Sequence, residues 1–401
     1  MTLPPLRLKK NEERRLRAGH VWVFSNEVDV ERTPLTDFEP GQPVAIEAAN
    51  GAPLGNGYVN PHSLICARLV SRDPDYKLDQ SLLVQRLNTA LSLRERLFEK
   101  PYYRLVFGES DGLPGLVVDR FGDVLAAQIT TAGMERVKDE IVGALQKVLK
   151  PRAVVLRNDT AVRALENLPS YVETALGDAP QNVTLNENGV LFETSVLTGQ
   201  KTGWFYDHRM NRARMQRYAP GRRVLDVFSY IGGWGVQAAA AGASEVVCVD
   251  SSRPALEQLR RNAELNNVAA RMTTVHEDAF TALQRLRAER RRFDVVILDP
   301  PAFIKRKKDA KEGVQTYRRL NQMALQVLEK DGILISASCS YHLERDTLRE
   351  LLLQTSRHLD RTLQILEQGH QGLDHPVHPA IPETDYLKAL IVRALTQASK
   401  S

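Results

Sequence analysis

The residues with the clearest chemical potential are Asp299 and Cys339, each placed directly after an apolar run. The run VVILDPPAF (residues 295–303) ends in Asp299, two prolines and an aromatic residue, and the run ending in SASCSYH carries Cys339. Runs rich in Val and Ile are typical of strands buried on both faces of a parallel sheet. Open α/β sheets bind their ligands at the carboxyl ends of the strands, so both side chains are predicted to lie at one binding edge.

A thiol and a carboxylate at one sheet edge predict methyl transfer to the C5 atom of a cytosine. Cytosine C5 is a weak nucleophile, but a thiolate that adds to C6 turns the ring into an enamine-like nucleophile at C5. Cys339 would be this thiolate, and Asp299 would share a proton with N3 and hold the exocyclic amine. Because the thiol must be partly ionised, a nearby cation is expected, and His342 and Lys201 are candidates.

The other two cysteines fit a structural role. Buried cysteines in strands usually act as small hydrophobic residues, and this interpretation suits Cys248, which lies mid-strand, and Cys66. Cys339 instead follows its apolar run at the predicted catalytic edge, which favours a nucleophile. The three cysteines have no CxxC spacing, so neither a disulfide framework nor a zinc site is expected, and a reducing cytoplasm fits best.

A glycine-containing turn followed by further strand-end acids predicts a nucleoside cofactor. The segment VLDVFSYIGGWG carries Asp226 at the end of a strand and reads DxFxxxGG, unlike the GxGxxG of dinucleotide sites. Asp250 ends the next strand, where an acid would grip ribose hydroxyls, and Asp278 ends the third strand, beside an adenine amine. This set suits an adenosine with a cationic amino-acid tail, which is S-adenosylmethionine.

Two further segments each have a functional and a structural interpretation. TGQKTGWFYDHR (residues 198–209) is polar, punctuated by glycine and aromatic, and would fold over the cofactor unless it is a plain interdomain linker. His370, His375 and His378 share the segment GHQGLDHPVHP, but no cysteine or pair of acids accompanies them. We therefore expect loop residues there and no metal.

The order of the elements predicts two small domains ahead of a larger one. Short alternating runs broken by Gly and Pro in residues 1–75 are typical of a small β-barrel. Residues 76–185 are predicted to form a central α+β domain with helices over about 79–97 and 134–149, and two strands that turn near Gly122. These elements and a following strand would make a compact β–α–β unit.

The second half of the chain predicts an α/β domain. Residues 186–210 hold a hairpin that turns at Asn188–Gly189, a strong hairpin dipeptide, and then the segment over the cofactor. In residues 211–401 apolar strands alternate with helical periods, which indicates a doubly wound, mostly parallel sheet of the Rossmann-like class. A last hairpin would add antiparallel strands at one edge of this sheet.

Length and charge bound the remaining possibilities. The 401 residues suggest two or three domains, and the chain has neither an apolar run long enough to span a membrane nor a secretion signal. The net charge of +5 permits an acidic partner. Of three basic clusters, residues 285–292 suit a solvated face, whereas residues 7–17 and 305–311 are expected to touch RNA. The predicted RNA contacts are Lys9, Lys10, Lys305, Arg306, Lys307 and Lys308.

These motifs resemble a known family. TGQKTGWFYDHR, VLDVFSYIGGWG, DPPAF, SCSYH and DHPVHPAIPETDYLK are together similar to the bacterial 23S ribosomal RNA cytosine-5 methyltransferases of the large-subunit methyltransferase I type, over essentially the whole chain. GHVWVFSNEV resembles their N-terminal PUA domain. The resemblance implies a PUA domain, a central domain, a class I methyltransferase domain, and Cys339 as nucleophile. The predicted cofactor contacts are Asp226, Phe228, Ser229, Tyr230, Gly232, Gly233, Asp250, Ser251, Asp278, Ala279, Asp299, Phe205 and Arg209.

Three alternatives stay open at this point. A related 7-methylguanine methyltransferase has a similar TGxKTGxFxDxR segment and DPP loop, but guanine N7 needs no cysteine, so the SCS sequence separates the two. A catalytically inactive, RNA-binding assembly factor would lack cofactor binding, and a small-molecule methyltransferase fits the basic clusters poorly.

Many cytosine-5 RNA enzymes carry a second cysteine where this chain has Ala302, so another group must promote elimination. A homodimer is left open.

Overall fold

The computed structural model describes residues 3–396, which divide into two units. Unit 1 comprises residues 3–183, 195–206 and 373–384, and unit 2 comprises residues 184–194, 207–372 and 385–396. The chain passes between the units repeatedly, and the segment 186–210, predicted as one hairpin and linker, contributes to both. The boundaries predicted after residues 75, 185 and 210 stay predictions, and residues 397–401 of the last predicted domain lie outside the described residues.

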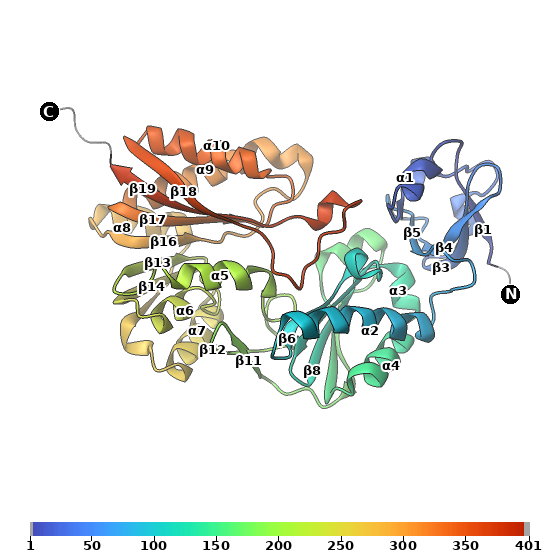
Figure 1. Ribbon diagram of the computed structural model, residues 1–401, viewed down its shortest axis with the longest axis horizontal. Helices are drawn as coiled ribbons and strands as arrows, with labels where there is room; N and C mark the ends of the chain where they lie inside the picture. The colour runs from blue at the N-terminus through green and yellow to red at the C-terminus, as the bar shows by residue number, and fades with distance from the viewer. Residues whose placement is uncertain (1–2, 397–401) are drawn as a thin grey trace. The chain divides into compact units, whose positions relative to one another are not determined.

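A seven-stranded sheet forms the centre of unit 2 (Figure 1). Its strand order is β15-β14-β13-β16-β17-β19-β18, with parallel pairing from β15 through β17 and antiparallel pairing of β19 with both neighbours. This confirms the predicted doubly wound sheet with an antiparallel hairpin at one edge. The strands are β13 Arg223–Val227, β14 Glu245–Asp250, β15 Met272–His276, β16 Phe293–Leu298, β17 Leu328–Ser338, β18 Arg361–Gly369 and β19 Lys388–Thr396.

Helices cover both faces of this sheet, as its apolar strands require. Apolar residues of α8, α9 and α10 join those of the strands in one core, and α9 and α10 lie along the same side of the sheet (Figure 1). Helices α5, α6 and α7 pack on the other side, with the hairpin β11–β12 beside α7. These elements are α5 Arg209–Gln216, α6 Gly235–Ala240, α7 Arg253–Leu265, α8 Ala279–Ala288, α9 Ala310–Val327, α10 Arg345–Arg357, β11 Val183–Glu187 and β12 Val190–Thr194.

Unit 1 begins with a five-stranded sheet in the order β1-β3-β4-β5-β2. Pairing is antiparallel except between β1 and β3, and one core of apolar side chains includes Cys66, which is fully buried as its structural interpretation predicted. The elements are β1 Pro5–Arg7, α1 Glu13–Arg17, β2 Trp22–Val23, β3 Gln42–Glu47, β4 Pro53–Val59 and β5 Ala67–Ser71.

A second five-stranded sheet, in the order β10-β9-β8-β7-β6, completes unit 1. Helices α2 and α4 pack side by side on one face of it (Figure 1), and the parallel pair β8–β9 connected through α4 is the predicted β–α–β unit. The elements are α2 Gln80–Leu97, β6 Tyr102–Phe107, β7 Leu116–Phe121, β8 Val124–Ile129, α3 Ala132–Arg136, α4 Lys138–Leu149, β9 Ala153–Asn158 and β10 Tyr171–Gly177.

Two details of this sheet differ from the sequence prediction. The helix predicted over 134–149 is broken at Val137, whose φ of −107° and ψ of 28° leave the helical region and separate α3 from α4. The prediction also missed the edge strands β6 and β10. The alternating apolar and polar residues of β10 give only a partly buried edge, which is a weak signal in a single sequence.

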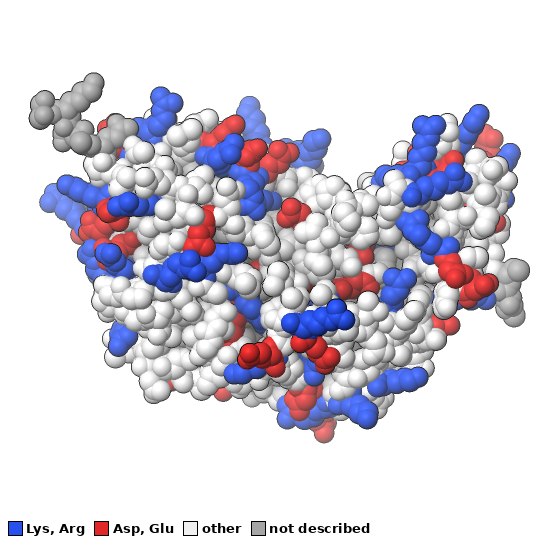
Figure 2. Space-filling view, in the orientation of Figure 1, with Lys and Arg blue, Asp and Glu red and all other residues white. Residues whose placement is uncertain are grey.

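Charged side chains of both signs are visible on one face of the molecule (Figure 2). On the face that Figure 2 shows, Lys and Arg side chains are interspersed with Asp and Glu. In the cluster 285–292, Arg285 pairs with Glu277 and Glu289. This pairing agrees with the solvated face that the sequence favoured for this cluster.

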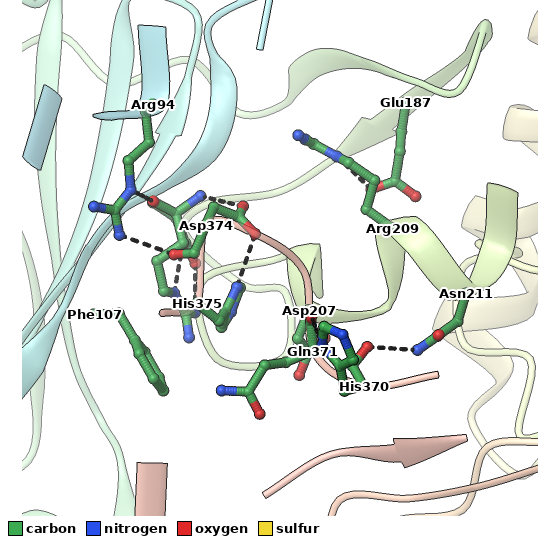
Figure 3. Close-up of polar contacts among 12 residues, drawn as sticks. Arg94, Phe107, Glu187, Asp207, Arg209, Asn211, His370, Gln371, Asp374 and His375 are labelled. Carbon is green, nitrogen blue, oxygen red and sulfur yellow. Dashed lines mark hydrogen bonds and ion pairs between the residues drawn. The ribbon is translucent and has the colours of Figure 1, made fainter. Parts of the chain in front are cut away.

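A buried arginine ties a late segment of the chain to the central sheet of unit 1. The Arg94 side chain is fully buried and its Nη1 and Nη2 atoms lie 2.6 and 2.7 Å from the two carboxylate oxygens of Asp111. Nη2 also donates to the Asp374 carbonyl oxygen at 2.9 Å, and the Asp374 carboxylate accepts from the Arg104 backbone N–H (Figure 3). His375 lies beside Asp374, with 2.9 Å between Nδ1 and Oδ1. Segment 373–384 is therefore held in place by hydrogen bonds to residues that are distant in the sequence.

Replacing Arg94 with Met should destabilise unit 1 by about 3–5 kcal/mol, because the Asp111 carboxylate would stay buried without its partner. Urea unfolding followed by circular dichroism measures this change. Arg96→Met is the matched control, since Arg96 lies exposed on the same helix, and it should alter the free energy of unfolding by less than about 0.5 kcal/mol. Equal effects of both substitutions would contradict this role for Arg94.

Candidate active site

Strand register brings the predicted catalytic residues to one edge of the sheet in unit 2. In the parallel pair β16–β17, Leu298 lies opposite Ser336, so Asp299 and Cys339 both follow closely on paired positions. In the antiparallel pair β17–β19, Ser338 lies opposite Lys388. The end of β17 is thus flanked by the DPP loop on one side and by the first residue of β19 on the other.

The glycine turn after β13 has an unusual backbone. Phe228 and Tyr230 adopt positive φ angles of 66° and 48°, and the N–H groups of Phe228 and Ser229 both donate to the Val249 carbonyl oxygen at 3.0 Å. Asp250 accepts from the Tyr230 N–H at 2.8 Å through Oδ2. Non-glycine residues with positive φ cost free energy and persist where the surroundings hold them, which is common at ligand sites.

Asp226 holds the end of this turn through a hydrogen bond to the first residue of α6. It is fully buried, and its Oδ2 accepts from the Gly235 N–H at 2.8 Å, whereas its Oδ1 is buried without a partner. Burial raises the pKa of Asp226 to about 8. A Cβ at Gly235 would collide with Cys248 Sγ, so the helix can approach the strand this closely only with glycine there. Cys248 is fully buried, which confirms its predicted structural role.

The remaining predicted cofactor residues occupy several environments. Gly232 and Gly233 are buried in the turn, and Ala279 is buried at the start of α8. Asp278 is exposed and caps α8 by accepting from the Phe280 and Thr281 N–H groups, and the bonds to Thr281 lower its pKa. Ser251 is exposed and directly follows β14. The carboxylates of Asp250 and Asp278 and the strained turn fit an adenosine with a cationic tail.

The segment predicted to fold over the cofactor is divided between the units. Phe205 belongs to unit 1, where Tyr206 is fully buried and donates to the Arg120 carbonyl oxygen at 2.8 Å. Arg209 belongs to unit 2, where it is buried with its Nε 3.7 Å from Glu187 Oε2 (Figure 3). Contacts of Phe205 and Arg209 with the cofactor stay predictions.

Asp299 is held by two donors that the sequence analysis did not select. Its Oδ1 lies 3.0 Å from His208 Nε2, and its Oδ2 accepts from Trp234 Nε1 at 2.9 Å. Burial would raise the pKa of Asp299, but the charge and hydrogen bond of His208 outweigh it, so the pKa lies below its ordinary value. Burial would likewise lower the pKa of His208, but Asp299 raises it above the ordinary value. The protonated imidazole of His208 and the carboxylate of Asp299 therefore stabilise each other.

Cys339 is half-buried and faces the loop that carries Asp299. Its Sγ lies 4.0 Å from the Pro300 carbonyl oxygen. The serines on either side of it are both bonded to the Tyr317 hydroxyl at 2.9 Å, and Ser340 Oγ also accepts from the Ile304 N–H at 3.2 Å. These bonds fasten the SCS segment to the DPPAF loop, so the thiol is held beside Pro300.

Lys388 is a second residue that the sequence analysis missed. Its side chain is largely buried, and Nζ donates to the carbonyl oxygens of Ser340 and Tyr386, each at 2.8 Å. Burial lowers the pKa of Lys388 to about 8, against the opposing attraction of Asp385 and Cys339. Lys388 is the last residue of the motif DHPVHPAIPETDYLK, but nothing in that motif indicated a role for its side chain.

The other predicted cations have different surroundings. His342 lies against the Tyr341 ring, with 5.3 Å between centroids, and Lys201 belongs to unit 1, where its Nζ lies 5.0 Å from the centre of the Phe205 ring. The predicted RNA contacts are all exposed, and two of them have partners: Lys9 donates to the Asn26 carbonyl oxygen and Arg306 pairs with Asp309. The exposed set is Lys9, Lys10, Lys305, Arg306, Lys307 and Lys308.

Within residues 3–396, no helix combines the length and apolar character needed to cross a membrane. In the same part of the chain, no three His, Cys, Asp or Glu side chains are grouped so that they could hold a metal ion. His370, His375 and His378 each contact a neighbouring residue of their own segment through a ring nitrogen.

Comparison with known proteins identifies the family. A model of the S-adenosylmethionine-dependent methyltransferases matches residues 162–393, and a model of PUA-like domains matches residues 6–72. Ribosomal RNA large subunit methyltransferase I from Erwinia tasmaniensis is 36% identical over 393 residues, which cover 97% of this chain and 98% of the relative. The chain belongs to this methyltransferase I family.

Further relatives agree with this assignment. The methyltransferase I of Aeromonas salmonicida is 37% identical over 393 residues, covering 96% of this chain and 98% of the relative. The crystal structure of SMU.776, a putative methyltransferase complexed with SAH, superposes with a TM-score of 0.84 at 20% identity and covers 98% of this chain and all of that one, which shows the shared fold. The predicted fold class, the PUA-like domain and the cofactor S-adenosylmethionine are thereby confirmed.

The ion pair of His208 and Asp299 should make stability depend on pH. Because the pKa of His208 is raised on folding, its stabilising contribution is complete below about pH 6.5 and is lost as pH rises through the folded-state pKa. His208→Gln should therefore flatten the decline of the free energy of unfolding as the pH rises above about 6.5. His358→Gln, at an exposed position, is the control and should leave the decline unchanged. An identical decline in wild type and His208→Gln would contradict the ion pair.

Proposed function

We propose that the protein transfers a methyl group from S-adenosylmethionine to C5 of a cytosine in the 23S ribosomal RNA of the large subunit, through a covalent adduct with Cys339. The relatives named above act, by their names, on large-subunit ribosomal RNA, which supports the RNA substrate. The observation that supports the chemistry is the half-buried thiol of Cys339, fixed beside the Asp299–Pro300 loop and close to the charge of Lys388.

In the proposed reaction, each bond that forms is matched by one that breaks or shifts, and the proton that is released goes to a base. The Cys339 thiolate forms a bond to C6, and the C5–C6 double bond shifts its electrons toward C5. C5 then takes the methyl group from the sulfonium, leaving neutral S-adenosylhomocysteine. A base removes the C5 proton, the C5–C6 double bond re-forms, and the thiolate leaves. The target base would be extruded from its stack to reach the sheet edge.

Asp299 would orient the base and would not donate a proton. Its pKa lies below the ordinary value and both of its oxygens already accept hydrogen bonds, from His208 and Trp234. A carboxylate has about four lone-pair sites, so two remain for the exocyclic amine of cytosine. This differs from the sequence expectation, in which Asp299 shared a proton with N3.

Lys388 would supply the cation that the thiol requires. Its ammonium has three N–H donors, and carbonyl oxygens accept two of them, which fixes the charge beside the SCS segment. A neighbouring positive charge lowers the pKa of a thiol. The other charged groups that act on Lys388 are Asp385 and Glu344, which raise its pKa, and Arg345, which lowers it.

The alternatives explain less of this geometry. Methylation of guanine N7 needs no thiolate, so a fixed cysteine beside a buried lysine would be without purpose. An inactive assembly factor would have no need of the strained turn at Phe228 and Tyr230. Nucleoside analysis of the RNA product decides between methylation of cytosine C5 and of guanine N7, because 5-methylcytidine and 7-methylguanosine differ in mass.

Cys339→Ala should lower formation of 5-methylcytidine by at least about 10³-fold, since the covalent step is lost. The assay is mass spectrometry of nucleosides after incubation with an unmodified transcript of large-subunit ribosomal RNA. S-adenosylmethionine binding, measured by calorimetry, should persist. Cys66→Ala, in the core of unit 1, is the control and should stay active. Normal 5-methylcytidine formation by purified Cys339→Ala would end the covalent proposal, and 7-methylguanosine as product would favour the alternative.

Lys388→Met should raise the pH midpoint of Cys339 alkylation by about one to three pH units, because the thiolate loses its neighbouring charge. The rate of iodoacetamide labelling across pH, followed by peptide mass spectrometry, gives this midpoint. Lys388→Arg keeps the positive charge, so its alkylation midpoint should stay close to that of the wild type. Lys330→Met, at an exposed position of β17, should leave the midpoint unchanged. An unchanged midpoint in a folded Lys388→Met protein would show that Lys388 does not act on the thiol.

A further inference from the structure

A polar cavity lies on the central sheet of unit 1, and its lining residues all belong to that unit. Its volume is about 380 Å³, within the roughly 300–1,000 Å³ of small-molecule sites. It is lined by side chains from β6 and β8, from the loop after β9 and from segment 195–206, all of unit 1. The lining includes Arg104, Gln128, Thr160, Ala161, Val162 and Lys201.

The position of Gln128 follows from strand alternation. Leu125, Ala127 and Ile129 of β8 pack in the core under helices α2 and α4. Alternate residues of a strand point to opposite faces, so Gln128 points away from the face that α2 and α4 cover. Asp119 and Arg157 contact segment 195–206 from the same sheet, through Thr202 and through the carbonyl oxygens of Val196 and Gly199. That segment therefore roofs part of the polar face.

Two polar atoms in this cavity have no partner. Gln128 is only 7% exposed, and its Nε2 makes no hydrogen bond in the structure. Thr160 Oγ1 is likewise buried without a partner. A buried polar atom without a hydrogen bond is costly, and native structures keep few of them. Because both atoms line one cavity, a polar ligand would satisfy both.

The rest of the lining indicates which ligand fits. Ala161 and Val162 are exposed and offer an apolar surface on which a flat ring can lie. The Gln128 amide has both a donor and an acceptor, the combination that recognises a base edge. The lining also contains Arg104, which pairs with Asp119, and Asp159, which pairs with Arg157, so the exposed ammonium of Lys201 is the charge that could meet a phosphate.

We propose that this cavity binds one single-stranded nucleotide of the RNA substrate, with the base edge on Gln128 and Thr160 and its phosphate at Lys201. The inference rests on RNA being the substrate, and it adds a recognition site that is separate from the nucleotide to be methylated. Sequence-specific RNA recognition commonly uses splayed, unstacked bases of this kind. The bound base would stack on the apolar side chains of Ala161 and Val162.

Gln128→Leu tests the base contact. It should raise the KM for an unmodified large-subunit ribosomal RNA transcript by about 5–100-fold, the worth of a good base contact, while kcat stays the same. Its melting temperature should stay equal or rise, since a buried unpaired amide is removed, so misfolding cannot mimic the effect. Gln146→Leu, the same change at an exposed position of α4, is the control and should keep the wild-type KM.

Two further measurements locate the ligand. Thr160→Val should raise KM in the same direction, and Lys201→Met should lower the slope of log affinity against log salt by about one. Saturation-transfer NMR with AMP, GMP, CMP and UMP should show at least one monophosphate whose signal is lost in Gln128→Leu.

The outcomes separate this inference from the proposed function. Methylation of RNA with a wild-type KM in folded Gln128→Leu would overturn the cavity as an RNA site and leave the methyltransferase intact. A wild-type protein that binds S-adenosylmethionine but methylates no RNA would overturn the proposed function itself. Equal KM increases in Gln128→Leu and Gln146→Leu would also contradict the cavity, because the effect would not depend on the buried amide.

Discussion

Strand pairing around β17 is the constraint that determines where Asp299, Cys339 and Lys388 lie. Parallel pairing with β16 sets Leu298 opposite Ser336, and antiparallel pairing with β19 sets Ser338 opposite Lys388. These two ladders bring a carboxylate, a thiol and an ammonium group from three strands to one place. A shift of one residue in either ladder would turn every following side chain to the other face of the sheet. The apolar residues of β16, β17 and β19, buried against helices, prevent that shift.

Local hydrogen bonds then refine what the strands place only roughly. Tyr317 holds the serines on both sides of Cys339, and Ser340 holds the backbone at Ile304, so the two loops behave as one piece. Trp234 and His208 each contact one carboxylate oxygen of Asp299 and so fix its orientation. Polar groups fixed in advance in this way need little rearrangement when a transition state forms, which is the largest single source of catalysis in many enzymes.

Sequence alone indicated what depends on periodicity and on strand ends. Alternating apolar runs predicted the doubly wound sheet, and the acids Asp226, Asp250 and Asp299 follow its strands because a strand end is visible locally. His208 and Lys388 were missed because their importance arises from contacts with residues 91 and 48 positions away. The break at Val137 was missed for a similar reason, since a helical pattern that is continuous in sequence does not reveal a single non-helical residue.

The repeated passage of the chain between the units limits how this protein can be assembled and divided. Unit 1 lacks a strap until residues 373–384 have been made, and the sheet of unit 2 lacks an inner strand, β19, until residues 388–396 follow. The core of unit 2 includes Leu390, Val392 and Ala394 of β19, so this core cannot close until the last strand has been made. The core clusters of the two sheets of unit 1 are built from buried residues between Leu6 and Leu156, so they can form earlier during translation. Because each unit is built from separate stretches of the chain, one cut in the backbone cannot release either unit intact.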